Sequence, residues 1–153
     1  MARIKQLPLR VESKNKSDVR TQFAALCYRI VDGKVQVLLV TTRRTGRWIL
    51  PKGWPMHGET PSDAAATEAW EEAGVKGKVA ATPIGLYSYE KYLDDAPDLP
   101  CVAVVYPLRV KSLATRFPEA GQRKRKWVSL KRAAKMVHEP ELARILKDFD
   151  PHS

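Results

Sequence analysis

The chain has few of the features that mark secreted or membrane-spanning proteins. Of its 153 residues only two are cysteines, Cys27 and Cys101, and both lie in runs of strand-forming residues. We therefore expect reduced core thiols and no disulfide framework. No apolar run reaches the roughly 18 residues of a membrane-spanning helix, and the start of the chain lacks the apolar segment of a secretory signal. These absences predict a single cytoplasmic domain, because the length is typical of one domain.

Positive charge is in excess, and it is clustered. Lys and Arg total 27 against 17 Asp and Glu, which gives a net charge of +10. The excess falls in residues 1–20, 42–52 and 121–126, and the rest of the chain is slightly acidic. Such clusters favour a polyanionic partner, which would be nucleic acid, anionic lipid or a phosphate-rich small molecule. Solvated lysines that serve only solubility are the alternative explanation.

The order of expected elements indicates one α/β domain, residues 20–150, behind a basic N-terminal arm, residues 1–19. Strands are expected at 22–30, 34–42, 79–89, 101–110 and 126–128, with a hairpin turn at Asp32-Gly33. Helices are expected at 61–73, 130–137 and 140–149. The first of these has a proline near its start, an alanine-rich body and Gly74 as its stop.

The helix expected at Pro61–Ala73 carries three carboxylates on one face. Glu68, Glu71 and Glu72 fall within about 100° of arc, opposite an alanine-rich face. Hard oxygen ligands gathered in this way suit Mg²⁺ or Mn²⁺, and a bound cation would cancel their mutual repulsion. An exposed acidic face that pairs with nearby lysines is the other interpretation.

Residues 53–75 resemble the signature of the Nudix hydrolases, G-x5-E-x7-R-E-U-x-E-E-x-G-U, where U is a bulky aliphatic residue. Six of the seven invariant letters are present, and they are Gly53, Glu59, Glu68, Glu71, Glu72 and Gly74. The departure is Thr67, which stands where the family has arginine. The resemblance implies an α/β/α sandwich with a mixed β-sheet and a loop–helix–loop box.

The resemblance also implies a chemistry, because Nudix enzymes hydrolyse phosphoanhydride bonds with a divalent metal, Mg²⁺ or Mn²⁺. Glu68, Glu72 and the backbone carbonyl of Gly53 would bind the metal. Glu71 would be the general base, while Glu59 and Gly74 would shape the box. The family arginine pairs with a box glutamate, so Thr67 leaves that role to another cation or to the metal, and Lys52 is the nearest cation in sequence.

Outside the box, the chain is similar to the diphosphoinositol polyphosphate phosphohydrolase branch, which also cleaves diadenosine polyphosphates. The similarity is carried by residues 24–29, 37–40, 47–49, 72–77 and 123–127. It implies a polyphosphorylated small-molecule substrate. The expected phosphate contacts are Arg20, Arg43, Arg44, Lys52, Arg123 and Arg125, since arginine forks suit phosphate oxygens. Where that branch often has consecutive glycines, this chain has Lys52, Gly53 and Trp54.

Other functions on the same scaffold stay open. A nucleoside triphosphate hydrolase and an RNA 5′-end pyrophosphohydrolase are the alternatives that the same scaffold allows. Tyr87, Tyr89 and Tyr92 would stack a nucleobase in a nucleotide hydrolase, although alternating tyrosines in a strand more often pack. A Nudix-like module without turnover would hold nucleic acid on its basic surface. The intact carboxylates argue against such a module.

Overall fold

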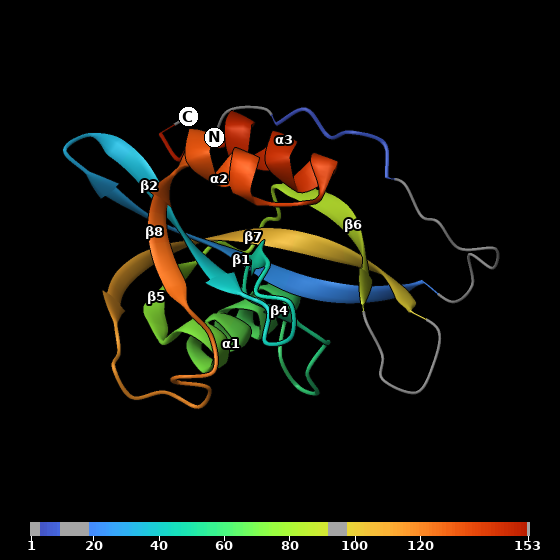
Figure 1. Cartoon of the computed structure of the whole chain (residues 1–153), viewed down its shortest axis with the longest axis horizontal. Coiled ribbons are helices and arrows are strands. Elements are labelled where there is room, and N and C mark those ends of the chain that lie inside the picture. Colours follow the sequence, from blue (N-terminus) through green and yellow to red (C-terminus); the bar gives the residue numbers. More distant parts are fainter. Residues whose placement is uncertain (1–3, 10–18, 92–97, 153) are drawn as a thin grey trace.

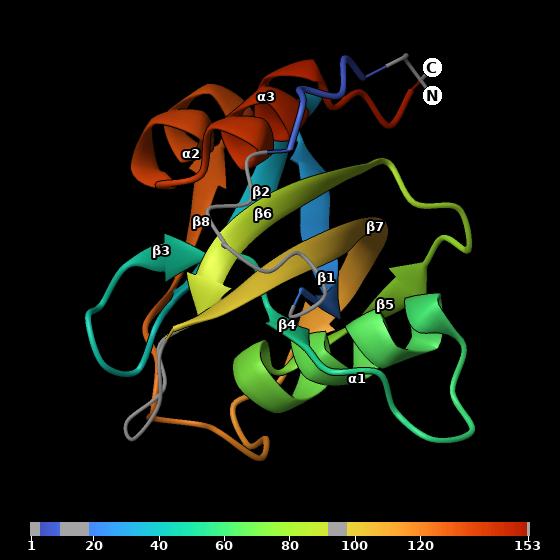
Figure 2. The ribbon, with the colours of Figure 1, turned by 90° about the vertical axis from the view of Figure 1, so that its right-hand side faces the viewer.

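The computed structural model describes residues 4–9, 19–91 and 98–152. Within these residues, an eight-stranded mixed sheet lies between two helical layers, as Figure 1 and Figure 2 show. Helix α1 (Pro61–Ala73) covers one face. Helices α2 (Leu130–Met136) and α3 (Pro140–Asp148) cover the other. The α/β/α sandwich expected from the sequence is confirmed.

Two long parallel strands organise the sheet. Strand β1 (Arg20–Val31) runs parallel to β7 (Leu99–Leu113) and pairs on its other side with β2 (Lys34–Thr41). The short strands β3 (Trp48–Ile49) and β8 (Arg125–Ser129) pair with β2, and β4 (Lys52–Gly53) pairs with β1. The β1–β2 connection is the expected hairpin, in which Asp32 and Gly33 both have positive φ.

Both faces of the central strands are buried, because successive side chains of a strand point to opposite faces. In β1, Ala24 and Leu26 join the apolar cluster under α2 and α3, whereas Ala25 and Cys27 join the cluster under α1. Cys27 and Cys101 are both buried free thiols, as expected. The sheet is therefore fixed from both sides, which holds α1 firmly against it.

The single strand expected at residues 79–89 is wrong. Strand β5 (Val75–Val79) ends before residues 80–84, and β6 (Gly85–Lys91) follows them. Pro83 lies in the interruption, and proline has no N–H to give to a sheet. Both strands pair with the same long neighbour, since β6 meets residues 99–105 of β7 and β5 meets residues 108–113.

The described part of the N-terminal arm lies against the domain. Ile4 packs on the core cluster under α2 and α3. The Gln6 side chain donates to the Leu86 carbonyl (2.8 Å) and accepts from the Leu86 N–H (2.7 Å), so it extends the edge of β6. The Lys5 N–H donates to Asp148 at 3.1 Å. Residues 1–3 and 10–18 of the predicted arm lie outside the described residues.

Candidate functional site

Local sequence fixes both ends of α1. The Thr60 side chain accepts a hydrogen bond from the Asp63 N–H (3.2 Å), and Pro61 occupies the first turn, where its missing N–H costs nothing. Gly74 adopts the left-handed conformation (φ 68°) and donates to the Trp70 carbonyl, which ends the helix. The alanine-rich face packs on the sheet. Glu68 and Glu72, in contrast, line a cavity of about 900 Å³ beside the helix.

Glu72 is buried and well partnered. Its side chain is 5% exposed, and its Oε2 accepts from the Lys52 backbone N–H at 2.8 Å. Its Oε1 lies 3.1 Å from Arg123 Nη2. Burial raises the pKa of Glu72 to about 7, against the opposing effect of Arg123 and Lys52. The Lys52 backbone N–H and the Arg123 guanidinium thus hold the Glu72 carboxyl group in one position.

Glu68 lies over Gly53, where a side chain would not fit. A Cβ built at position 53 would overlap the Glu68 carboxyl group. Burial and, to a smaller extent, the neighbouring Glu72 and Glu71 together raise the pKa of Glu68 to about 8. The two carboxyl groups disfavour each other's negative charge. A divalent cation bound to both would offset this repulsion. The residues therefore fit the Mg²⁺ or Mn²⁺ expected from the sequence.

The site suits a metal ion that has only a few protein ligands. Among the described residues, no group of three His, Cys, Asp or Glu side chains is placed to hold a metal ion. Mg²⁺ commonly binds one or two carboxylates and keeps water or substrate phosphate as its other ligands. Glu68, Glu72 and the backbone at Gly53 match that pattern. We call this part of the cavity, defined by these three residues, the α1 end.

Glu71 is placed differently from the other two box carboxylates. Its side chain is half-buried and is not part of the cavity lining. Its backbone carbonyl accepts from the Glu119 N–H at 2.9 Å. Glu119 does line the cavity. The structure therefore brings Glu68, Glu72 and Glu119 to one wall and leaves the predicted base beside it.

Arg123, expected as a phosphate contact, is engaged with the protein itself. Its Nη2 lies 3.1 Å from Glu72 and 3.3 Å from Glu119, and its Nη1 donates to the Thr41 carbonyl at 3.1 Å. Its side chain is 11% exposed. The guanidinium therefore joins the connection before β8 to α1 and β2, and it neutralises two carboxylates at once.

Thr67, which stands at the position of the family arginine, forms hydrogen bonds of its own. Its hydroxyl lies 3.1 Å and 3.2 Å from the two carboxylate oxygens of Glu59 and donates to them. Glu59 is exposed and outside the cavity lining. A hydrogen bond from an uncharged donor thus tethers the loop before α1 to the helix, while the charge of Glu72 is balanced by Arg123.

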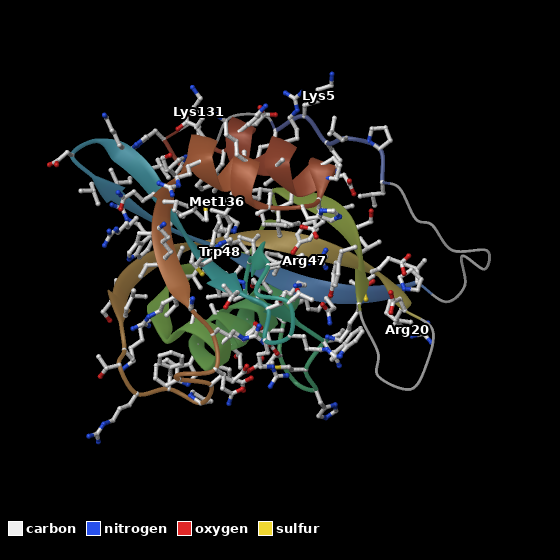
Figure 3. The ribbon with its side chains drawn as sticks, viewed as in Figure 1. Lys5, Arg20, Arg47, Trp48, Lys131 and Met136 are labelled. Atoms are coloured by element: carbon white, nitrogen blue, oxygen red, sulfur yellow. The ribbon has the colours of Figure 1, made fainter. Side chains whose placement is uncertain are left out.

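The other expected phosphate contacts divide into two groups. Arg43, Arg44 and Lys52 line the cavity, whereas Arg20 and Arg125 do not. Figure 3 shows Arg20 at the far end of β1, away from Arg47 and Trp48. The Arg125 Nη1 donates to the Ala73 carbonyl at 2.6 Å, so this guanidinium satisfies the C-terminal end of α1.

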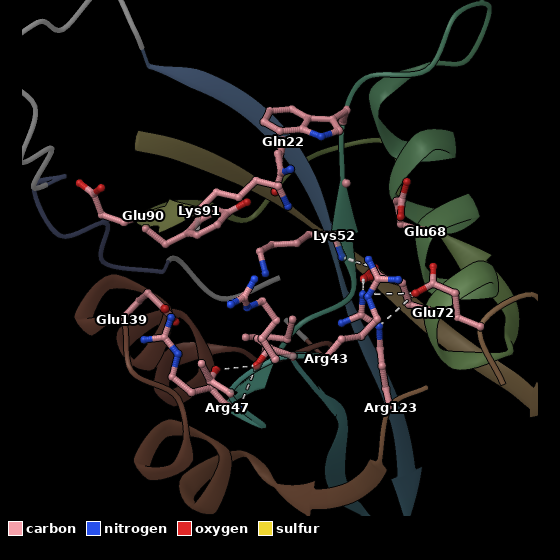
Figure 4. Close-up of a pocket in the computed structure, with 18 of the residues that line it drawn as sticks. Gln22, Arg43, Arg47, Lys52, Glu68, Glu72, Glu90, Lys91, Arg123 and Glu139 are labelled. Atoms are coloured by element: carbon pink, nitrogen blue, oxygen red, sulfur yellow. Dashed lines mark hydrogen bonds and ion pairs between the residues drawn. The ribbon is translucent and has the colours of Figure 1, made fainter. Parts of the chain in front are cut away.

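Sequence reasoning did not name Gln22, Arg47, Lys91 or Glu139 as site residues, yet all four line the cavity. Tyr89, named in the sequence analysis as a possible stacking residue, lines it too. Figure 4 shows Glu68 and Glu72 on the α1 side, Glu90 and Glu139 on the opposite side, and Lys52 between them. Arg47 has a sequence signal, since it belongs to the basic cluster at residues 42–52. Gln22 and Glu139 have none, because only the tertiary fold brings β1 and α3 together. Tyr92 lies outside the described residues.

Comparison with known proteins gives one family. The model described as the NUDIX domain matches residues 20–149. A curated relative, diphosphoinositol polyphosphate phosphohydrolase 3-beta of Homo sapiens, is 31% identical over 92% of this chain and 84% of its own length. Nudix hydrolase 12, mitochondrial, of Arabidopsis thaliana is 30% identical over 76% of this chain and 59% of its own length. The chain thus spans about three-fifths of the length of that Arabidopsis relative.

A solved structure shares the fold. The crystal structure of a C. elegans Ap4A hydrolase binary complex superposes with a TM-score of 0.63 at 22% identity, covering 85% of this chain and 94% of that chain. Within the described ranges, every helix is too short or too polar to cross a membrane. The expected cytoplasmic location stays a prediction.

Proposed function

The chain belongs to the Nudix family, and from this membership we propose that it is a metal-dependent hydrolase of phosphoanhydride bonds. The proposed substrates are diphosphoinositol polyphosphates or diadenosine polyphosphates, the compounds named by a curated relative and by the solved Ap4A hydrolase. The observation that carries the proposal is the cavity itself, whose lining combines Glu68 and Glu72 with Arg43, Arg44 and Lys52. The carboxylates suit a divalent cation, and the basic side chains suit phosphate oxygens.

The residues of the α1 end would hold the ion, which supplies neutralisation of phosphate charge and a more acidic water. Glu72 is pre-positioned for this role by the Lys52 N–H and by Arg123. Gly53 permits it, because any side chain there would displace Glu68. Arg43 and Arg44 are exposed at the rim, where they would receive the phosphates as the substrate enters.

Glu71 remains the proposed general base. Its half-buried side chain adjoins the cavity wall, and catalytic hydrogen bonds often form only once substrate is bound. Glu71→Gln should then lower kcat by about 10²- to 10⁴-fold, the usual contribution of general base catalysis. Mn²⁺ affinity, measured by titration, should be unchanged. A variant with full activity would remove Glu71 from the mechanism.

Hydrolysis of a substrate panel, with the products separated by anion-exchange chromatography, tests the function. The panel contains a diphosphoinositol polyphosphate, diadenosine tetraphosphate, a nucleoside triphosphate and 5′-triphosphorylated RNA, each with Mg²⁺, with Mn²⁺ and with chelator. We expect metal-dependent turnover of at least one of the first two. Turnover confined to the triphosphate or the RNA would move the chain to another Nudix activity. No turnover, with binding intact, would indicate the non-catalytic polyanion-binding module.

A further inference from the structure

The cavity is less positive than the protein that surrounds it. The whole chain carries a net charge of +10, yet the described residues that line the cavity include six acidic and six basic side chains, so their formal charges cancel. A metal ion would offset Glu68 and Glu72 at the α1 end, and Arg123 already pairs with Glu72 and Glu119. The acidic side chains without such a balance lie elsewhere in the lining.

Two of them, Glu90 and Glu139, lie on the side of the cavity opposite α1, which we call the far end (Figure 4). Glu90, on β6, is exposed, so water and salt screen its charge. Glu139, at the start of α3, is only 8% exposed, and its Oε1 atom has no hydrogen-bond partner among the described residues. A substrate would therefore meet the negative charge of the far end mainly at Glu139.

The comparison with a buried neighbour shows how little Glu139 contributes to the fold. Glu141, two residues further along the chain and 3% exposed, accepts from the Ser88 N–H (2.9 Å) and from the Ser88 hydroxyl (2.7 Å), which ties α3 to β6. Glu139 is the N-cap residue of α3, yet its side chain makes no capping hydrogen bond. Buried polar atoms in native proteins are nearly always paired, so an unpaired carboxylate oxygen beside the cavity points to a functional role.

A carboxylate at this place disfavours a second anion. It has only acceptor oxygens to offer, and so has a phosphate group. Solvent weakens repulsion between exposed charges, whereas a buried charge keeps more of it, because the effective dielectric constant is lower. Figure 4 shows Lys52 between the far end and Glu72. A phosphate chain that starts at the α1 end thus has a cation partner before it reaches Glu139.

We propose that Glu139 determines specificity by rejecting substrates that carry phosphate at the far end. Phosphate confined to a chain beside the α1 end is accepted, and the group that reaches the far end is uncharged. Among the proposed substrates, this favours a diadenosine polyphosphate, whose two ends are uncharged nucleosides, over a diphosphoinositol polyphosphate, whose ring carries phosphate groups around it. The inference rests on the proposed function and selects between its two substrate classes.

Binding of inositol hexakisphosphate, which has no phosphoanhydride bond to cleave, tests the repulsion without turnover. Glu139→Gln removes the charge and keeps the size of the side chain. Calorimetry at fixed ionic strength, without metal, should give a Kd about 10- to 100-fold lower for this variant than for the unmodified protein, as expected when one like charge leaves a partly buried site. Glu90→Gln, which removes an exposed carboxylate from the same side, should lower the Kd by less than about threefold.

Turnover with Mg²⁺ tests the same charge in the reaction. The unmodified protein should have a higher kcat/KM for diadenosine tetraphosphate than for 5-diphosphoinositol pentakisphosphate, and Glu139→Gln should reduce that ratio by about 10-fold or more. Glu139→Ser, with the same expected result, serves if Glu139→Gln does not fold, because serine is a favoured N-cap residue.

The outcomes separate this inference from the proposed function. An unchanged Kd in the Glu139 variant would overturn the inference, and so would an equal change in the Glu90 variant. A higher kcat/KM of the unmodified protein for the diphosphoinositol substrate would also overturn it, while leaving the hydrolase intact. A Kd shift confined to the Glu139 variant, with no turnover of either substrate, would support the role of Glu139 and refute the proposed hydrolase.

Discussion

The carboxyl groups on the two sides of the cavity differ in how many hydrogen bonds the protein gives them. At the α1 end, Glu72 receives a backbone N–H and an arginine, although burial still raises its pKa to about 7. On the opposite side of the cavity, the Glu139 Oε1 atom receives no hydrogen bond from the described residues. The α1 end is thus pre-organised by the chain, as a catalytic group requires. Glu139 has no comparable support among the described residues.

The first way to break this comparison is to disable the α1 end alone. Glu72→Gln removes one negative charge facing the substrate, while its amide oxygen still accepts from the Lys52 N–H. Turnover should fall by roughly 10³-fold or more. This loss is larger than the one expected from removing a residue that only supports a metal ligand. The unfolding free energy without metal should change by less than about 2 kcal/mol, because the main hydrogen bond is kept.

Steady-state kinetics and urea unfolding measure both quantities. Retained turnover in the Glu72 variant would remove Glu72 from the site.

The difference between the ends also explains what sequence could predict. The box residues lie within one short stretch of chain, so local rules on helix capping and helical periodicity placed α1 and its bounds correctly. They did not separate Glu71 from Glu68 and Glu72, which line the cavity without it. The single strand expected from Val79 began where β5 ends and ran through Pro83, which lies in the gap before β6. That β5 and β6 both pair with the long β7 is a tertiary feature that no local pattern encodes. Gln22 and Glu139 line the same cavity although they are far apart in sequence, and no local pattern encodes that placement.

Arg123 illustrates a further limit of sequence reasoning. The basic cluster at residues 121–126 predicts phosphate contacts, yet the fold places the Arg123 guanidinium against Glu72 and Glu119. Its neighbour Lys124 is exposed. Charge counts locate a basic segment, whereas the direction of each side chain follows from the connection between β7 and β8.

The second prediction concerns Arg123 as a positioning residue of the α1 end. Arg123→Gln removes the charge that balances Glu72 and Glu119, and kcat should fall about 10- to 100-fold, as for residues that orient a metal ligand. KM should change little, and Mn²⁺ affinity should fall with kcat. Lys126→Gln, an exposed change on β8, is the matched control and should alter neither quantity. A rise in KM with unchanged kcat would instead show that Arg123 contacts phosphate, as the sequence suggests.

The smallest effect is expected at Thr67, and it tests which residue has taken over from the family arginine. Thr67→Arg replaces a hydroxyl hydrogen bond to exposed Glu59 with an exposed ion pair. Because such pairs contribute at most about 1 kcal/mol, the fold should persist and turnover should change less than about fivefold. Combined with Arg123→Gln, the new arginine should not restore kcat, since Glu59 lies outside the cavity that Arg123 helps to organise. Rescue in the double variant would show that an arginine at position 67 reaches the α1 end, and that Thr67 and Arg123 share one role.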